Sequence, residues 1–173
     1  MAGPIAAAWH WACGLDVAVR KAGNVSQASA GHRMAARQFL DSARAAAQAL
    51  TDSDGVGQGI ERAVAATRDA VGCNTNLGIL LLCVPLARAR RALTVASPAA
   101  LLGAVEGVLA GLDLDDARAG YRAIALAAPG GLGTADAEDV ADAPRVDLRQ
   151  AMALAADRDS IARQYRDGFR DIL

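Results

Sequence analysis

The sequence contains few of the residues on which many enzyme and binding classes depend. Of its 173 residues only 3% are aromatic, and it has two histidines, three cysteines and a single lysine against seventeen arginines. Two histidines are too few for a histidine-rich metal centre. Three cysteines, none in a Cys-x-x-Cys pair, do not make a disulfide framework, so we expect a reduced, cytoplasmic setting.

The chain also lacks a strong net charge and a long apolar run. Eighteen basic and nineteen acidic residues give a net charge of −1, so the chain has no overall excess of positive charge with which to bind a nucleic-acid backbone. The longest apolar run, residues 77–87, is interrupted by Pro85 and is shorter than the ~20 residues that cross a bilayer. No basic segment precedes Ile5, which disfavours a signal peptide. We expect neither a nucleic-acid partner nor a membrane partner.

Alanine is abundant, at about a quarter of all residues, while β-branched and aromatic side chains are sparse. Alanine is the best intrinsic helix former because it loses no side-chain entropy in a helix. Apolar residues recur at helical intervals, and no alternating segment is long enough for a strand. We therefore predict an all-α fold, a compact bundle forming a single domain over residues 1–173. About seven helices are expected, near 5–21, 33–50, 56–71, 76–93, 98–110, 115–128 and 147–171.

Two helix starts carry recognisable caps. Ser97 followed by Pro98 suits a helix N-terminus, with the serine as cap and the proline in the first turn. Asp147 with Gln150 three residues later predicts a capping box at the start of the last helix.

The first polar loop, residues 20–34, contains the only lysine. Lys21 precedes a Gly-Asn turn, where its ammonium could lie against a phosphate. The alternative is a cation at a helix C-terminus, favoured by the helix dipole and followed by a glycine stop. His32 is equally open: it either donates to a phosphate or acts as an acid, or it caps the following helix.

Two further loops are rich in polar or small residues. Residues 72–78 place Asn74, Thr75 and Asn76 just before the most hydrophobic helix. Asparagine and threonine cap helices, but one cap needs only one side chain, and free N–H groups at a helix start also suit an anion. This segment is therefore either a cap pair or a ligand-contacting turn, and residues 129–133 are either a flexible connection or a lid.

Acidic pairs lie on the last expected helix beside arginines. They are Asp157 with Asp159 and Asp167 with Asp171. Such pairs form a solvated, ion-paired helix face. They are alternatively carboxylates for Mg²⁺, which proteins commonly hold through one or two acids plus substrate phosphates.

Taken in order, these segments resemble the triphosphoribosyl-dephospho-CoA synthase family, the all-helical ATP:dephospho-CoA triphosphoribosyltransferases. The matching segments are 21–26, His32 with Phe39, Ser42 and Ala43, and then 72–78, 129–133 and 159–165. The resemblance implies a transferase in coenzyme biosynthesis that uses ATP and 3′-dephospho-CoA, releases adenine and usually works with Mg²⁺. The protein would fix the triphosphate and hold the acceptor hydroxyl in line with the ribose.

The resemblance also implies roles for particular residues. The binding candidates are Lys21 and His32 for phosphate, Asn24 and Ser26 for ribose or phosphate, and Asn74, Thr75 and Asn76 for nucleotide orientation. The candidates for a catalytic base are Asp157 and Asp159, and no metal ligands are assigned. We therefore expect the turns after the first and third helices to converge on one polar pocket for a polyphosphate nucleotide.

The chain departs from the family pattern at three points. Lys-Pro-Gly becomes Lys-Ala-Gly at residues 21–23, Asn-Thr-His-Lys-Gly becomes Asn-Thr-Asn-Leu-Gly at 74–78, and His-x-Asp becomes His-Arg-Met at 32–34. These changes remove a rigid turn, an imidazole with an ammonium, and one carboxylate. The pattern looks more like a divergent branch that accompanies pterin-linked one-carbon pathways, so a related phosphoribosyl-type transferase in that biosynthesis is one alternative.

Family members usually continue beyond this length, so the chain resembles the N-terminal part of the family's longer domain. The last expected helix carries an apolar stripe of Leu154, Ile161, Tyr165, Phe169 and Ile172. If exposed, this stripe predicts a homodimer or a complementing subunit as partner. A non-catalytic helical subunit or remnant of the family is the second alternative function.

Overall fold

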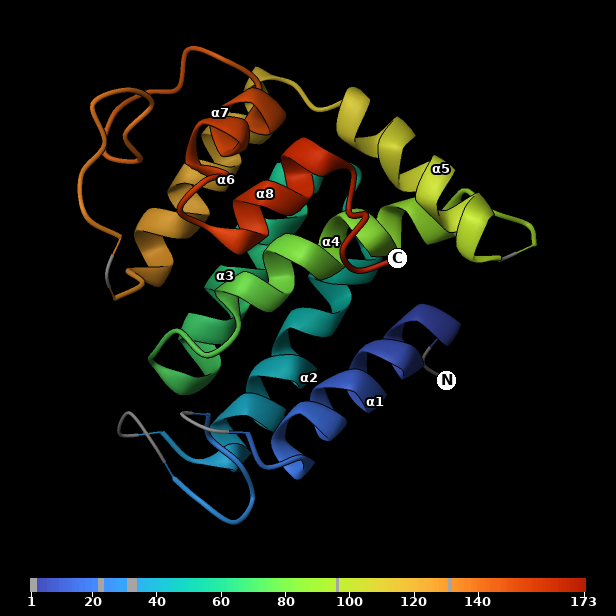
Figure 1. The fold of residues 1–173 in the computed structure, drawn as a ribbon. Helices are drawn as coiled ribbons and strands as arrows, with labels where there is room; N and C mark the ends of the chain where they lie inside the picture. Colours follow the sequence, from blue (N-terminus) through green and yellow to red (C-terminus); the bar gives the residue numbers. More distant parts are fainter. Residues whose placement is uncertain (1–2, 22–23, 31–33, 96, 131) are drawn as a thin grey trace.

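A computed structural model describes residues 3–21, 24–30, 34–95, 97–130 and 132–173. In these ranges the chain forms eight α-helices and no strand, and Ser26 and Ser29 form an isolated β-bridge. The helices are α1 (Pro4–Ala18), α2 (Ala36–Asp52), α3 (Val56–Val71), α4 (Leu77–Arg91), α5 (Pro98–Ala110), α6 (Leu114–Ala127), α7 (Leu148–Ala155) and α8 (Ser160–Asp167) (Figure 1). The all-α prediction is confirmed.

The eighth helix arises because the last expected helix is broken. A turn at residues 156–159 separates α7 from α8, where the sequence predicted one helix over 147–171. Asp159 starts α8: its Oδ1 accepts hydrogen bonds from the backbone N–H groups of Ile161 and Ala162, at 2.7 and 2.9 Å. Gly168, with φ +72°, ends α8 in the left-handed conformation that glycine adopts without strain. The apolar stripe continues across the turn and so hid this second helix start.

Ser97 and Asp147 both cap their helices as predicted, but the described hydrogen bonds do not include the return bond from Gln150 that would complete a capping box. The Ser97 hydroxyl accepts a hydrogen bond from the Ala100 N–H at 3.1 Å, at the start of α5. The Asp147 carboxylate accepts one from the Gln150 N–H at 2.8 Å, at the start of α7. These bonds satisfy N–H groups that have no partner within their own helix.

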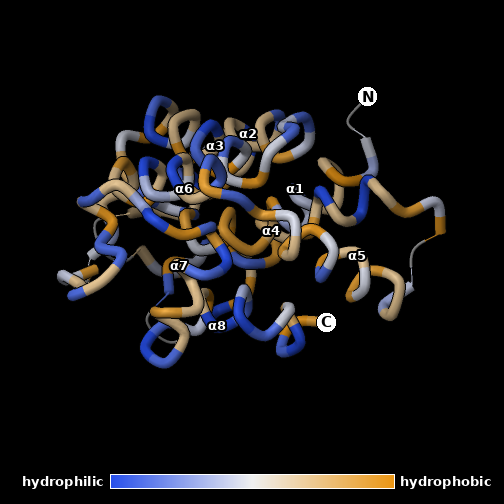
Figure 2. Tube along the Cα trace, turned by 90° about the horizontal axis from the view of Figure 1, so that it is seen from above, coloured by the Kyte–Doolittle hydropathy of each residue, from blue (hydrophilic) through white to orange (hydrophobic). Residues whose placement is uncertain are grey.

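The helices pack in layers around α3 and α4. Helix α3 contacts α2, α6 and α4, while α1 packs on α2, α5 on α4, and α7 on α6 and α8. Seen from above, α4 lies between α8 on one side and α2 and α3 on the other (Figure 2). This order brings the start of α4, the end of α6 and the α7–α8 turn together. None of the described helices has both the length and the apolar character that crossing a membrane requires.

Helices α3 and α6 approach so closely that only glycine fits between them. The Gly57 N–H donates to the Asp116 carboxylate at 2.7 Å, and a Cβ on Gly57 would lie 2.2 Å from the Asp116 carbonyl oxygen. Real Cβ atoms essentially never come within 3.0 Å of such an atom. The small residues of the sequence thus set the position of α6 on α3.

Helix α8 and the turn that follows it each place one aromatic residue in the core. The Tyr165 hydroxyl donates to the Leu81 carbonyl oxygen at 2.6 Å, and the Tyr165 and Phe169 ring centroids are 5.6 Å apart. Both aromatic residues are fully buried within this chain, while Leu154 and Ile172 are exposed. The central part of the predicted apolar stripe is therefore covered by the chain's own helices, which removes much of the reason for expecting a partner there.

Candidate functional site

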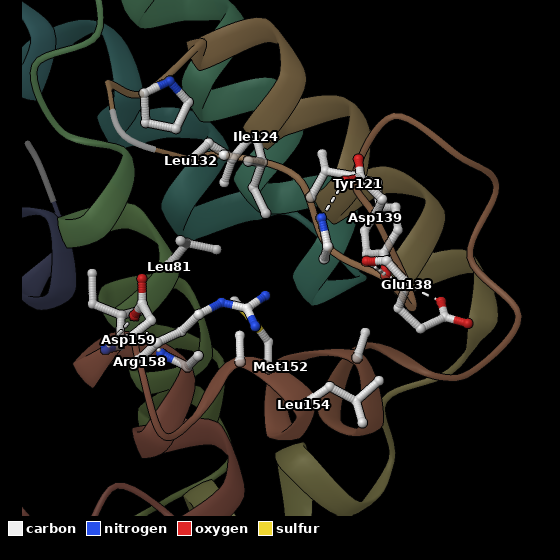
Figure 3. A pocket seen from close by; sticks show the side chains of 18 of the residues that line it. Leu81, Tyr121, Ile124, Leu132, Glu138, Asp139, Met152, Leu154, Arg158 and Asp159 are labelled. Carbon is white, nitrogen blue, oxygen red and sulfur yellow. Dashed lines mark hydrogen bonds between the residues drawn. The ribbon is translucent and has the colours of Figure 1, made fainter.

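Two adjoining cavities lie where α4 begins and α6 ends. The larger has a volume of about 510 Å³ and lies between α4, α6, α7, the start of α8 and the 129–140 segment (Figure 3). The smaller, of about 440 Å³, lies between the start of α2, the α3–α4 turn and the end of α6. Asn74, Pro129 and Gly130 line both cavities, so the two meet there.

The walls of the larger cavity are mainly apolar, and its polar groups come from three places. The apolar walls include Leu81, Ile124, Leu132, Met152 and Leu154. The polar side chains are Asn74 before α4, Arg158 and Asp159 in the α7–α8 turn, and Glu138 and Asp139 in the covering loop. The cavity therefore suits a ligand that has both apolar and charged parts.

Arg158 is the positively charged group of the larger cavity. Figure 3 shows its side chain extending from the α7–α8 turn into the cavity. Neighbouring arginines are occupied: Arg149 pairs with Glu106, and Arg166 bonds to Asp157 and Asp167. No carboxylate of the described residues lies within 4.0 Å of the Arg158 guanidinium. This guanidinium is available to an anionic ligand.

The loop that covers the larger cavity is held by one tyrosine. The Tyr121 hydroxyl bonds to the Glu138 carbonyl oxygen at 3.0 Å and to Glu138 Oε2 at 3.1 Å, and the same Oε2 accepts the Arg145 N–H. Burial, and then this hydrogen bond to Glu138, raise the pKa of Tyr121 well above its usual value. The tyrosine therefore stays protonated and keeps donating.

Asp139 shapes the same loop from within. Its carboxylate accepts the backbone N–H of Ala141 at 2.8 Å and of Ala135 at 2.7 Å. These two bonds hold the pKa of Asp139 below its usual range. These bonds fix the conformation of residues 135–141, part of which lines the larger cavity.

We expect Tyr121→Phe to loosen this loop selectively. The change removes the hydroxyl that holds Glu138, so amide hydrogen exchange over residues 132–146 should become faster. Global stability should fall by only about 1 kcal/mol, the usual net worth of one hydrogen bond. Amide exchange in the middle of α3 serves as the internal control. It should become faster only to the extent that the small loss of global stability requires. Unchanged exchange in the loop would show that Tyr121 does not hold it.

The smaller cavity is more polar and also holds an arginine. Arg68 lies in the last turn of α3, and no described carboxylate is within 4.0 Å of its guanidinium. Opposite α3, Gln38 of α2 donates its Nε2–H to the Cys73 sulfur at 3.6 Å. This contact ties α2 to the α3–α4 turn and closes one side of the cavity.

Comparison with known proteins identifies the family. The family model described as CitG: ATP:dephospho-CoA triphosphoribosyl transferase matches residues 2–173. The chain belongs to this family. No curated protein and no solved structure matches it significantly. The match confirms the resemblance found in the sequence segments and supports a transferase of coenzyme biosynthesis.

In this family member, the predicted residues of the 72–78 segment differ in position: one lines the cavities and two lie outside them. Asn74 lines both cavities, and its Oδ1 accepts the Leu77 N–H at 3.1 Å, so it also caps α4. The Thr75 hydroxyl donates to the Ser42 hydroxyl at 2.6 Å. The Thr67 hydroxyl donates to Asn76 Oδ1 at 3.2 Å, and the buried Asn76 Nδ2 has no described partner. Of the three predicted residues, only Asn74 faces the cavities.

Of the residues predicted in the first loop, the three that the structure describes, Lys21, Asn24 and Ser26, line neither cavity. The Lys21 ammonium pairs with the Asp16 carboxylate. Asn24 is exposed, and Ser26 is buried with its hydroxyl 2.9 Å from that of Ser29. His32 is among the residues that the structure does not describe. Figure 1 shows the α1–α2 connection at the same end of the bundle as the α3–α4 turn, and Met34, which follows this loop, lines the smaller cavity.

The two candidate bases lie in different surroundings. Asp159 lines the larger cavity and uses Oδ1 to cap α8, while none of the described hydrogen bonds involves its Oδ2. The Asp157 side chain is 98% exposed, is 3.0 Å from the Arg166 guanidinium and lines neither cavity. The turn between α7 and α8 thus separates two carboxylates that are two residues apart.

Sequence reasoning missed both cavity arginines. Arg68 lies four residues before Gly72, which ends α3, and Arg158 immediately precedes Asp159. Their proximity to the two matching segments was the available signal. An arginine near a helix end also fits interaction with the helix dipole, so sequence alone did not select these two.

Cys13 and Cys83 are poor candidates for nucleophiles. Burial raises the pKa of Cys13 to about 12 and that of Cys83 to about 11. A thiol with a raised pKa carries little thiolate at neutral pH, and the thiolate is the reactive form. Cys73, beside the smaller cavity, accepts the Gln38 hydrogen bond.

Proposed function

We propose that the protein transfers the triphosphoribosyl group of ATP to 3′-dephospho-CoA and releases adenine. The observation that carries this proposal is the pair of cavities that meet at Asn74, Pro129 and Gly130. Three segments that match the family form these cavities although they are far apart in sequence. Two polyanionic substrates need two adjoining sites, and the junction is where their reacting atoms would meet.

In this proposal the triphosphate of ATP occupies the smaller cavity. Arg68 supplies positive charge, and the Asn74 side chain, which also lines this cavity, supplies an amide. The family resemblance assigns Lys21 and His32 to phosphate, and Lys21 would exchange its contact with Asp16 for that phosphate. It assigns Asn24 and Ser26 to ribose or phosphate, although neither lines a cavity in this structure.

Mg²⁺ enters as part of the nucleotide substrate. Within the described ranges no three His, Cys, Asp or Glu side chains are grouped so that they could hold a metal ion. A protein can hold Mg²⁺ through one or two carboxylates while substrate phosphates supply other ligands. The ion would neutralise phosphate charge, and the protein groups position the complex.

Asn74 orients the ribose at the junction. Its Oδ1 is engaged with the start of α4, which fixes the side chain, and none of the described hydrogen bonds involves its Nδ2–H₂ group. That amide can donate to a ribose hydroxyl. Thr75 and Asn76 position Asn74 indirectly. Their hydrogen bonds to Ser42 and Thr67 fix the turn on which Asn74 lies.

The chemistry follows from this placement. The bond between ribose C1′ and adenine N9 breaks with its electron pair going to adenine, and positive charge builds on the ribose. A hydroxyl of the acceptor attacks C1′, and Asp159 accepts the proton of that hydroxyl as general base. The covering loop limits access of water, which would otherwise compete with the acceptor for C1′.

The test is incubation with ATP, Mg²⁺ and dephospho-CoA, with free adenine measured by chromatography and the product by mass spectrometry. We expect adenine only when the acceptor is present, in equal amount to a product whose mass is that of the acceptor plus the triphosphoribosyl group. No adenine, or adenine released equally without acceptor, would contradict the proposed transfer.

A second candidate is a non-catalytic helical subunit that keeps the fold. One observation favours it: Asn76 and Leu77, which stand where the family has an imidazole and an ammonium, are only 6% and 7% exposed. Neither position contributes a charged group to the cavities. This candidate predicts no adenine release and no difference between the wild-type protein and Lys21→Ala in thermal shift with ATP.

A further inference from the structure

Each of the two cavities contains one arginine without an ion-pair partner among the described residues. Arg68 lines the smaller cavity and Arg158 the larger one, and the junction at Asn74, Pro129 and Gly130 lies between them. Arg149 and Arg166, on the same helix pair as Arg158, are both paired with carboxylates. The Arg158 side chain extends into the larger cavity (Figure 3), and none of the described ion pairs involves it.

We infer that Arg158 binds the diphosphate of the acceptor, dephospho-CoA. This inference rests on the proposed function and adds where the second substrate lies. A guanidinium presents several N–H donors in a planar fork that matches two phosphate oxygens. Arg158 is exposed, so a diphosphate that enters the cavity can reach it.

The acceptor fits the larger cavity better than the ATP triphosphate does. Dephospho-CoA joins a diphosphate to adenosine on one side and to a long, largely uncharged arm on the other. Leu81, Met152 and Leu154 provide the apolar surface for such neighbouring parts. The triphosphate of ATP, with more charge and no such arm, belongs with Arg68 in the smaller, more polar cavity.

The acidic residues of the larger cavity do not occupy Arg158. Both Asp139 oxygens accept backbone N–H groups, and Glu138 accepts from Tyr121 and from the Arg145 N–H. Asp159 uses one oxygen to cap α8. The carboxylates therefore hold the loop and the helix start, while the guanidinium stays available for phosphate.

The experiment compares wild type, Arg158→Ala, Arg158→Lys and a control, Arg62→Ala, by calorimetric titration with dephospho-CoA and separately with ATP and Mg²⁺. Arg62 is an exposed arginine of α3 that lines neither cavity. Each titration with dephospho-CoA is repeated with saturating 2′-fluoro-ATP, whose fluorine disfavours positive charge on the ribose, so that ordered binding is also detected. Thermal unfolding of each variant checks that it is folded.

We expect the dissociation constant for dephospho-CoA to rise about tenfold or more in Arg158→Ala, as for loss of charge-assisted hydrogen bonds. Arg158→Lys should recover part of the loss because it keeps the charge without the fork. The ATP dissociation constant should not change, and Arg62→Ala should behave as wild type. Unchanged affinity for dephospho-CoA, or a loss for ATP as large as for the acceptor, would overturn the inference.

Failure of this inference can be told from failure of the proposed function. If dephospho-CoA binding depends on Arg158 but the protein releases no adenine, the acceptor site is supported and the proposed transfer reaction is contradicted. If adenine release depends on the acceptor but is the same in wild type and Arg158→Ala, the transfer reaction is supported and the acceptor site at Arg158 is contradicted. A wild-type protein that does not bind dephospho-CoA, with or without the ATP analogue, rejects the inference outright.

Discussion

Replacing Asp159 with asparagine should slow acceptor-dependent adenine release by about 100-fold or more, the usual range for loss of a general base. Asp157→Asn should leave the rate unchanged. Asp159 lines the larger cavity, whereas Asp157 lines neither cavity and pairs with Arg166. The two substitutions each remove one negative charge, at positions two residues apart. A difference between their rates therefore reflects the different surroundings of the two carboxylates and not the change in net charge.

Asparagine is the informative replacement because it preserves the local structure. In Asp159→Asn the amide oxygen of the new side chain can still accept the N–H groups of Ile161 and Ala162, and asparagine caps helices as well as aspartate does. The melting temperature should therefore change little, while the group that accepts the hydroxyl proton is lost. The loss should appear in kcat more than in KM for ATP.

The measurement is the initial rate of adenine release for wild type, Asp159→Asn and Asp157→Asn at saturating substrates, with thermal unfolding of each protein. Equal rates for Asp159→Asn and wild type would show that the base lies elsewhere. Equal losses in both variants would indicate a general effect of charge at the α7–α8 turn and would remove the assignment of Asp159.

Replacing Gly57 with alanine should destabilise the protein by about 3 kcal/mol or more, at the upper end of overpacking effects. A Cβ at this position would lie 2.2 Å from the backbone carbonyl oxygen of Asp116. A backbone atom cannot rotate away as a side chain can, so α6 must move from α3. That movement also strains the bond between the Gly57 N–H and the Asp116 carboxylate.

Gly103→Ala in α5 is the matched control. No atom lies within 4 Å of a Cβ at Gly103, so the same change there meets open space. It should stabilise the protein by about 0.5–1 kcal/mol, because alanine loses less backbone entropy than glycine in a helix. Urea denaturation of the three proteins measures both effects. Similar midpoints for Gly57→Ala and Gly103→Ala would refute the close α3–α6 contact.

The sequence alone determined the helical architecture and the family. Helix propensity and capping act within a few residues, so the alanine content, Ser97 and Asp147 were sufficient to predict helices and two of their starts. The family segments could be read in order for the same reason, since each is a short, local pattern. The break at 156–159 was missed because the apolar stripe runs through it and only the Asp159 cap marks it.

Only the tertiary structure decided which polar residues share a site. Whether a side chain faces a cavity depends on how α3, α4, α6 and the α7–α8 pair are rotated and packed, and these contacts join distant parts of the chain. That packing turns Asn76 into the interior, leaves Asp157 in solvent, and brings Arg158 and Asp159 to a cavity that Asn74 also lines. Local pattern specifies the helices, and long-range packing specifies the site.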